Sequence, residues 1–335
     1  MPVRMKDIAQ ALDVSIVTVS KALRGHPDIA AETRERILAR ARELNYRPNR
    51  MARSLVTGRS ELIGLVVPDL VHPFFGEIAK SLSAALRQLN FFLVVSSSDG
   101  DPALEQAEIE HMLAYRLDAL VVASCQPTPD LLLEVPAYGT PLILLDRSFP
   151  NFPCHFVGAD DYQIGVLATE HLIAAGRTRI AHIRGSFNSV GDQRAQGFAD
   201  TLRKHKLPQH PEYDVSAPFV DATARRDGHT AMDRLLALPS PPDAVFCIND
   251  AAALGAMESA HAAGLEIPRD LAIIGCGNYH YDDTLRVPLS SVDQASEAMG
   301  QRIAQLIQQI VESKSPPAPA LIILAPSLVV RHSSS

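Results

Sequence analysis

Along most of this chain, short apolar runs alternate with longer stretches in which apolar residues recur at helical spacing. Because the runs are apolar throughout, they are typical of strands buried on both faces of a parallel sheet. The expected strands are Leu62–Pro68, Phe91–Ser96, Ala119–Ala123 and Leu142–Leu145, and the helices between them are near Phe75–Leu89 and Pro102–Tyr115.

The same alternation starts again after Val157. It predicts strands near Ile180–Arg184, Ala244–Ile248 and Leu271–Gly275, and helices near Asp161–Ala175, Gln193–Lys204, Arg225–Leu238 and Ala251–Ala263. Two such series indicate an α/β unit of two doubly wound parallel-sheet halves. Sheets of this kind bind ligands outside the carboxyl ends of their strands, so the loops directly after the strands are the candidate binding residues.

The residues before Leu62 have a different pattern, with short helical segments and no strand. Two segments between Met5 and Leu23 are separated at Asp13-Val14, which predicts a helix-turn-helix. Ser15 is placed to cap the second helix. A third helix is expected from about Glu32 to Asn45, and because Ala30 offers no capping side chain we expect this helix to be weaker by roughly 1 kcal/mol.

Charge separates this N-terminal region from the rest of the chain. The first sixty residues carry twelve Lys or Arg and six Asp or Glu, whereas the remaining 275 carry nineteen and thirty-two. A soluble surface requires net charge, but it does not require one sign of charge at one end. A basic N-terminal unit on an acidic body therefore predicts binding to a polyanion.

The next segment reads Tyr46-Arg47-Pro48-Asn49-Arg50-Met51-Ala52-Arg53-Ser54-Leu55-Val56-Thr57-Gly58. Together with the helix pair it resembles the lac repressor and purine repressor family of bacterial transcription regulators, and the match continues through almost the whole chain. The resemblance implies a helix-turn-helix domain (1–48), a hinge helix and linker (49–60), and a ligand-binding and dimerisation domain (61–335) of periplasmic-binding-protein-like fold. Within this domain it implies an N-subdomain of about 61–158 and 293–324, and a C-subdomain of about 159–292 and 325–335.

In that family the second helix reads the major groove of double-stranded operator DNA. This implies that Ile16, Val17 and Lys21 meet the base edges, with Lys21 as the main polar reader because apolar side chains can only touch a thymine methyl. Phosphate contacts, which set register but not sequence, are expected from Thr18, Ser20, Arg24 and Arg34. The full set expected at the DNA from this domain is Ser15, Ile16, Val17, Thr18, Ser20, Lys21, Arg24 and Arg34.

By the same resemblance, 49–56 is a hinge helix that orders on the operator and inserts a leucine into the minor groove. A helix of about two turns is shorter than the ~12 residues needed for marginal stability in isolation, so its order is expected to depend on DNA and a partner helix. Leu55 is the expected wedge, and Asn49, Arg50 and Arg53 are expected to contact the backbone and groove.

The candidate effector residues are polar and aromatic side chains in the loops after the strands. Carboxylate, guanidinium, amides and aromatic rings together suit a polyhydroxylated ring, which predicts a small sugar-like effector. The resemblance extends to ribose-binding proteins and implies that Phe74 and Phe75 sandwich the sugar ring. The expected effector residues are His72, Phe74, Phe75, Asp146, Arg147, Arg194, Asn249, Asn278 and Gln294.

One position departs from the family pattern, because Gly277 stands where an Asp usually grips the ligand. Two explanations stay open: Asn278 or His280 substitutes for it, or the effector is larger and uses the vacated space. Arg147 and Arg194 also suit an anion, so a purine or sugar-phosphate effector remains the alternative. Purely structural roles stay open as well, such as an internal Asp146–Arg147 ion pair and helix capping by Asn249.

Other functional classes receive little support. The sequence has no phosphate-binding Gly-Lys-Ser/Thr loop, no Gly-x-Gly-x-x-Gly after the first strand, no Gly-x-Ser-x-Gly and no metal-ligand cluster, so we expect no enzyme, cofactor or metal. A sugar-metabolising enzyme with a regulatory head is the alternative from another class. The four cysteines, Cys125, Cys154, Cys247 and Cys276, form no close pair and are expected to be reduced.

Cellular location and assembly are the last expectations. The sequence shows no apolar stretch of membrane-spanning length and no secretion signal, which predicts a cytoplasmic protein without a membrane partner. The C-terminal residues carry no leucine heptads, which favours a homodimer over a tetramer. The resemblance places the dimer contacts around Ile78–Leu89 and Met257–Gly264.

Overall fold

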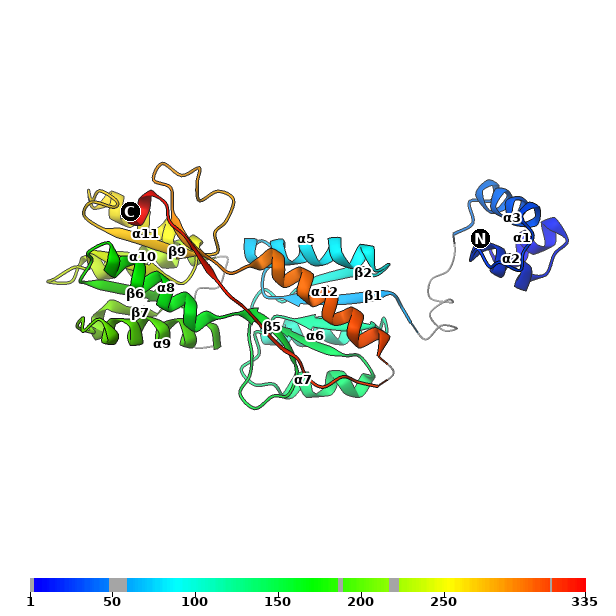
Figure 1. Ribbon diagram of the computed structural model, residues 1–335, viewed down its shortest axis with the longest axis horizontal. Coiled ribbons are helices and arrows are strands. Elements are labelled where there is room, and N and C mark those ends of the chain that lie inside the picture. Colours follow the sequence, from blue (N-terminus) through cyan, green and yellow to red (C-terminus); the bar gives the residue numbers. More distant parts are fainter. Residues whose placement is uncertain (1–2, 48–58, 186–188, 217–222, 314) are drawn as a thin grey trace. The chain divides into compact units, whose positions relative to one another are not determined.

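A computed structural model describes residues 3–47, 59–185, 189–216, 223–313 and 315–335 of the chain. The chain divides into two compact units, Met1–Ser60 and Glu61–Ser335 (Figure 1). In the described residues, no helix is long and apolar enough to cross a membrane.

The first unit is a bundle of short helices around one small core. Its helices are α1 (Met5–Leu12), α2 (Ile16–Leu23) and α3 (Ala31–Glu43). Ile8, Val19 and Ile37, one from each helix, are completely buried against one another. The helix-turn-helix expected from the apolar spacing is therefore confirmed.

The ends of these helices follow the local chemistry of the sequence. Asp13 ends α1 in a left-handed conformation, with a φ of 52°. The Ser15 side chain accepts a hydrogen bond from the backbone N–H of Thr18 at 3.0 Å, so it caps α2 as expected. Ala30 precedes α3 without a side-chain cap, again as expected.

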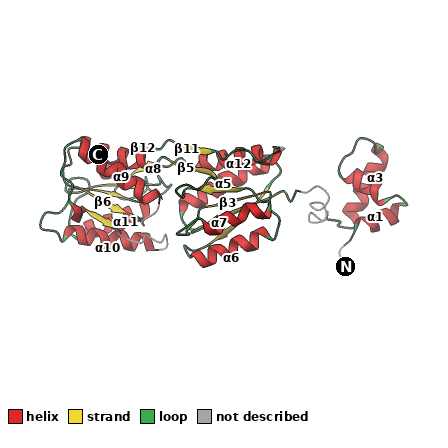
Figure 2. Ribbon diagram, turned by 90° about the horizontal axis from the view of Figure 1, so that it is seen from below, coloured by secondary structure: helices red, strands yellow, loops and turns green. Residues whose placement is uncertain are grey.

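The second unit contains two six-stranded sheets, each covered by helices on both faces (Figure 2). The first sheet has the order β11-β5-β4-β3-β1-β2, with all its neighbouring strands parallel. Its strands are β1 (Leu62–Val67), β2 (Phe92–Ser97), β3 (Ala119–Val122), β4 (Leu142–Leu145), β5 (His155–Ala159) and β11 (Leu321–Leu324). Its helices are α5 (Pro73–Gln88), α6 (Pro102–Leu113), α7 (Asp130–Glu134) and α12 (Ser296–Glu312).

The second sheet has the order β12-β10-β9-β8-β6-β7, and only the β10–β12 pair is antiparallel. Its strands are β6 (Ile180–Arg184), β7 (Asp214–Ser216), β8 (Ala244–Cys247), β9 (Ala272–Cys276), β10 (Ser290–Asp293) and β12 (Ser327–Val329). Its helices are α8 (Asp161–Ala174), α9 (Ser189–Lys204), α10 (Ala224–Leu236) and α11 (Asp250–Ala262). The expected doubly wound halves are thus confirmed.

The chain passes between the halves after β5, after β10 and after β11. Elements near these crossings, α12 and strands β5, β10, β11 and β12, were not predicted by the sequence patterns, and neither was the short edge strand β7. All four cysteines are free.

Glycines set the spacing of the helix pairs of the second half. Gly165 of α8 and Gly197 of α9 lie against each other's helix backbones, as do Gly228 of α10 and Gly255 of α11. A Cβ at Gly255 would overlap the backbone oxygen of Arg225. These helices therefore pack at a separation that only glycine allows.

Candidate DNA interface and effector site

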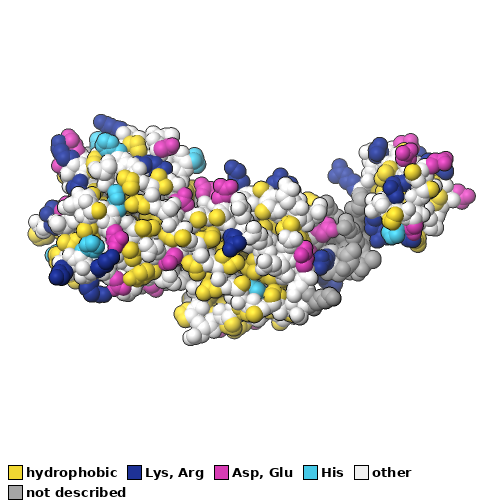
Figure 3. Space-filling view, viewed as in Figure 1, with side chains coloured by type: hydrophobic (Ala, Val, Ile, Leu, Met, Phe, Trp, Pro, Cys, Tyr) yellow, Lys and Arg dark blue, Asp and Glu magenta, His cyan; other side chains and the backbone are white. Residues whose placement is uncertain are grey.

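The exposed surface of α2 carries the residues that the sequence places at DNA. Ile16 is 49% and Val17 is 64% exposed, although both side chains are apolar. In the face seen in Figure 3, this unit displays cationic and anionic side chains side by side.

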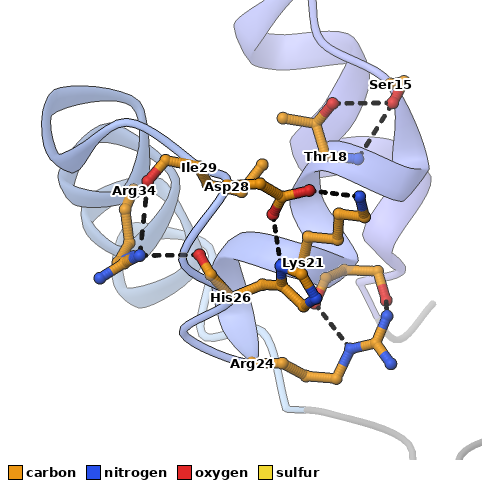
Figure 4. Close-up of polar contacts among 9 residues, drawn as sticks. Ser15, Thr18, Lys21, Arg24, His26, Asp28, Ile29 and Arg34 are labelled. Carbon is orange, nitrogen blue, oxygen red and sulfur yellow. Dashed lines mark hydrogen bonds and ion pairs between the residues drawn. The ribbon is translucent and has the colours of Figure 1, made fainter.

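Lys21, the expected polar reader, has a carboxylate partner. Its Nζ lies 2.5 Å from Oδ2 of Asp28, while Oδ1 of the same carboxylate lies 2.5 Å from Nδ1 of His26 (Figure 4). The hydrogen bond from Lys21, together with His26, lowers the pKa of Asp28 below its usual value. Sequence reasoning did not single out Asp28.

Two of the expected phosphate-contacting arginines make internal hydrogen bonds. Arg24 donates from Nε to the backbone oxygen of Ser20 at 3.1 Å and from Nη2 to its hydroxyl at 3.0 Å (Figure 4). Arg34 donates from Nη2 to the backbone oxygen of His26 at 2.8 Å. Arg34 therefore ties the loop before α3 to that helix. The expected hinge residues Asn49, Arg50, Arg53 and Leu55 lie outside the described residues.

In the second unit, Arg194 is the centre of a buried polar network. Only 3% of it is exposed, and it donates from Nε to Oδ1 of Asp161 at 2.9 Å, from Nη1 to the Ile248 carbonyl at 2.7 Å and from Nη2 to Oε1 of Gln294 at 2.6 Å. The structure thus brings together two expected residues, Arg194 and Gln294. Asp161 was missed because its position depends on β5, which the sequence did not predict.

Burial raises the pKa of Asp161 to about 7, while the adjacent Arg194 guanidinium acts in the opposite direction. A second Asp–Arg pair follows β4, where Nε of Arg147 lies 3.9 Å from Oδ2 of Asp146. Arg147 also donates from Nη1 to the carbonyl of Ser124 at 3.3 Å. In these two pairs, each cationic side chain has a carboxyl group as its neighbour.

The expected sandwich by Phe74 and Phe75 is wrong. Their ring centroids are 5.1 Å apart at an interplanar angle of 70°, and both residues are 3% exposed, so the rings contact each other and leave no room for a sugar between them. His72 meets Phe75 at 5.6 Å and Tyr279 at 5.8 Å, the latter at 89°. Burial lowers the pKa of His72 to about 4, so its ring is neutral at pH 7.

The space above Gly277 is not available to a larger effector, which corrects one of the two explanations given above. A Cβ at this glycine would overlap the ring of Tyr279 and come within 2.7 Å of Oδ2 of Asp250. Tyr279 is 1% exposed and packs in the same core cluster as Phe74 and Phe75.

Asn278 is engaged within the chain. Its Nδ2 donates to Oδ2 of Asp293 at 2.9 Å, and its Oδ1 accepts from Nη2 of Arg331 at 2.7 Å. Both polar ends of the side chain are therefore used to join the β9–β10 connection to the C-terminal segment. The exposed His280 packs its ring on Tyr281 at 5.4 Å.

Asn249 caps α11, because its Oδ1 accepts from the N–H of Ala252 at 2.8 Å. The next residue, Asp250, is completely buried and accepts a hydrogen bond from Ser291 Oγ at 2.7 Å. Its carboxyl group also meets that of the buried Asp282. Burial and this second carboxyl group raise the pKa of Asp250 well above its usual value, so the pair retains a proton.

These features define a class of protein: a helix-turn-helix unit joined to a two-halved α/β unit whose strand ends converge on a polar, aromatic junction. Comparison with known proteins supports this class. Residues 4–49 match the description "Bacterial regulatory proteins, lacI family", and residues 60–325 match "Periplasmic binding proteins and sugar binding domain of LacI family". The chain belongs to the LacI family of bacterial transcription regulators; it is a DNA-binding regulator and not an enzyme.

Individual relatives cover almost the full chain. The HTH-type transcriptional regulator DegA of Bacillus subtilis (strain 168) is 30% identical over 339 residues, covering 100% of this chain and 99% of its own. The ribose operon repressor of Haemophilus influenzae (strain ATCC 51907 / DSM 11121 / KW20 / Rd) is 30% identical over 330 residues, covering 98% of each. The HTH-type transcriptional repressor PurR of Pasteurella multocida (strain Pm70) is also 30% identical, over 331 residues and with 98% coverage of each.

The fold is also found in solved structures. A lac repressor dimer bound to operator and the anti-inducer ONPF superposes with a TM-score of 0.88 at 25% identity, covering 100% of this chain and 99% of that one. A complex of the transcriptional regulator CelR with cellobiose has a TM-score of 0.73 at 24% identity, with 99% coverage of each chain.

Proposed function

We propose that this regulator is a repressor that binds a pseudo-palindromic operator of roughly 16 to 20 base pairs as a homodimer, and that a neutral, sugar-like effector switches it. Carbohydrate-utilisation genes are the proposed targets, and the cytoplasm is the proposed location. The network around Arg194 carries the effector part of this proposal.

The effector class follows from charge and hydrogen-bonding capacity. Arg194 already donates to a carboxylate, a carbonyl and an amide, and Arg147 lies beside Asp146. His72 is neutral at pH 7 because burial lowers its pKa to about 4. Since a phosphate requires cationic donors that are not already neutralised, these groups favour an uncharged ligand with hydroxyl groups.

A purine effector is the competing candidate. The relatives do not distinguish the two, since a ribose operon repressor and a PurR repressor are equally similar to this chain.

The proposed dimer surface includes the two expected segments, Ile78–Leu89 and Met257–Gly264. Within the first of them, Ile78, Leu82 and Leu86 are completely buried in the core, so only the exposed side of α5 can face a partner. Two apolar side chains on the adjacent edge strand β2, Phe92 and Val94, are 44% and 37% exposed. We include them in the proposed dimer surface together with the exposed side of α5. Light scattering of the purified protein tests the assembly, and a stable tetramer would contradict it.

In the proposed mechanism, effector binding changes the relation of the two halves and thereby the order of the two hinge segments (49–56) in the dimer. Effector binding and operator binding then share one conformational equilibrium of the protein. Binding of either one must therefore change the protein's affinity for the other by the same factor. A coupling of about 1 to 3 kcal/mol corresponds to roughly 5-fold to 150-fold.

The first test is thermal stabilisation of the full chain by free pentoses and hexoses, polyols, sugar phosphates and purines, with Arg147→Ala as the control variant. A ligand at 100 times its Kd should add about 2.7 kcal/mol of stability. A shift by one neutral sugar in the wild type but not in the variant would support the proposal. A shift by phosphates or purines alone would replace the neutral-sugar effector with the alternative.

A further inference from the structure

Asp28 places a carboxylate beside the one cationic side chain of α2 that is expected to read bases. Lys21 lies in the last turn of α2, and its ammonium group meets Asp28 at 2.5 Å. The two side chains are 36% and 45% exposed, so the pair lies at the surface. A carboxylate at a DNA-binding surface repels phosphates, and it requires an explanation in a basic unit.

The position of Asp28 is set by contacts on both sides of its loop. The N–H of His26 donates to the carbonyl of Lys21 at 3.0 Å, which joins the start of the loop to α2. Arg34 of α3 donates to the carbonyl of His26 at 2.8 Å, and the His26 ring meets Asp28 at 2.5 Å (Figure 4). The loop is thus held between two helices, with its carboxylate directed at Lys21.

We propose that Asp28 is a specificity-determining residue of the DNA-binding unit, because it orients the Lys21 ammonium group for a base edge and cancels its charge on DNA that lacks a matching base. This inference rests on the proposal that α2 reads the major groove.

The chemistry of the ammonium group provides the reason. Lys21 has three N–H donors, and Asp28 uses one, so the others remain for acceptors such as guanine O6 and N7. On non-matching DNA the pair stays neutral and adds nothing to phosphate binding. Without the carboxylate, Lys21 is a mobile cation that binds any phosphate, and this raises affinity for DNA of every sequence.

The experiment compares full-length wild type, Asp28→Asn and Glu35→Gln in fluorescence-anisotropy titrations with two duplexes. One is the duplex that the wild type selects from a randomised 20-base-pair pool, and the other is a scrambled duplex of the same composition. Glu35 is an exposed carboxylate on α3, so its substitution makes the same change in net charge away from Lys21. Circular dichroism confirms that each variant is folded.

For Asp28→Asn we expect affinity for the scrambled duplex to rise by up to about 8-fold at 0.1 M salt. One added phosphate contact should steepen the slope of log affinity against log salt concentration by about 0.9, and 0.9 log units correspond to about 8-fold. Affinity for the selected duplex should not rise, so the ratio of the two affinities falls. Glu35→Gln should leave that ratio unchanged. An unchanged ratio in Asp28→Asn, or the same change in both variants, would overturn the proposal.

Lys21→Ala separates this inference from the assignment of α2. If that variant keeps full selectivity, α2 does not read bases through Lys21 and the role of Asp28 fails, whereas base reading by Ile16 and Val17 is left intact. If it loses selectivity, adding Asp28→Asn to it should have no further effect on the ratio, since the carboxylate acts through the lysine. A further loss in the double variant would overturn the role of Asp28 alone.

Discussion

Replacing Arg194 with Met should be one of the most destabilising single substitutions in the second unit. The substitution removes the counterion of Asp161, a side chain that is 5% exposed, and leaves the carbonyl of Ile248 and the amide oxygen of Gln294 without their donor. Removing one partner of a buried ion pair typically costs about 3 to 5 kcal/mol. For a unit of this size, this corresponds to a loss of roughly 6 to 20 °C in Tm.

The assay is urea unfolding followed by circular dichroism, because the chain contains no tryptophan. Arg203→Met is the matched control, since Arg203 lies on the same helix but is 67% exposed, and it should change stability by less than about 0.5 kcal/mol. The double variant Arg194→Met/Asp161→Leu replaces the ion pair with apolar groups. It should recover about 2 kcal/mol relative to the single variant, because no buried charge is left without a partner.

The pH dependence supplies a second readout. Burial raises the pKa of Asp161 in the folded state, and without the Arg194 guanidinium nothing opposes this effect. A carboxyl group with a raised folded pKa holds a proton that the unfolded chain releases, so stability falls as pH rises above about 4. Arg194→Met should thus lose more stability at pH 8 than at pH 5. A loss below about 1 kcal/mol in Arg194→Met, or a double variant no more stable than Arg194→Met, would refute the reasoning.

Three further outcomes are expected. Gly255→Ala should cost about 1 to 3 kcal/mol because its Cβ meets backbone, whereas Gly76→Ala, whose Cβ would meet only the Leu70 carbonyl oxygen at 3.9 Å, should cost nothing, as measured by urea midpoints. Asp250→Asn should gain stability relative to wild type as pH rises from 5 to 8, because burial raises the pKa of Asp250 in the folded state and the amide replaces its proton; a pH-independent difference would argue against this. Ser15→Ala should weaken α2 by about 1 kcal/mol in amide exchange while Ser15→Asp does not, and equal effects would exclude capping.

Local signals in the sequence were sufficient for much of the fold. Apolar runs located β1, β3, β4, β6 and β8, and the helical spacing around Ser15 located α1 and α2. The spacing of Met299, Ile303 and Ile307 also carried a helical signal for α12 that was not used. In these elements the buried apolar side chains recur at the spacing of a helix or a strand, and a short stretch of sequence is enough to show that spacing.

Strand β10 could not be found in this way. It contains Ser290 and Ser291, which are completely buried. Ser290 donates from its hydroxyl to the carbonyl of Arg331 at 2.9 Å, and its N–H donates to the hydroxyl of Ser333 at 2.8 Å. Because these partners lie about forty residues away, burial of Ser290 depends on the C-terminal segment and not on local hydrophobicity.

The same limit applies to the effector residues. Loops after strands correctly suggested that Arg194 and Gln294 are close, although they are 100 residues apart in sequence. They did not suggest Asp161 or Tyr279, because each takes its position from a distant partner. The geometry of the aromatic rings could not be predicted from the sequence either. A sandwich by Phe74 and Phe75 requires a separation between the two rings that their packing against each other excludes.

The position of Gln294 indicates how the Arg194 network connects the two halves. Its amide oxygen is held by Arg194 in the second half, and α12 begins at Ser296, directly after the crossing from β10. Ser296 donates from its hydroxyl to Oε2 of Glu77 on α5 at 2.6 Å. At Gly300, α12 approaches the α5 backbone so closely that a Cβ would lie 2.7 Å from the N of Leu82. Since packed helices move as rigid bodies, we expect a shift of Gln294 relative to Arg194 to move α12 and α5 together. This pair of helices is therefore the link that we propose between the Arg194 network and the first half.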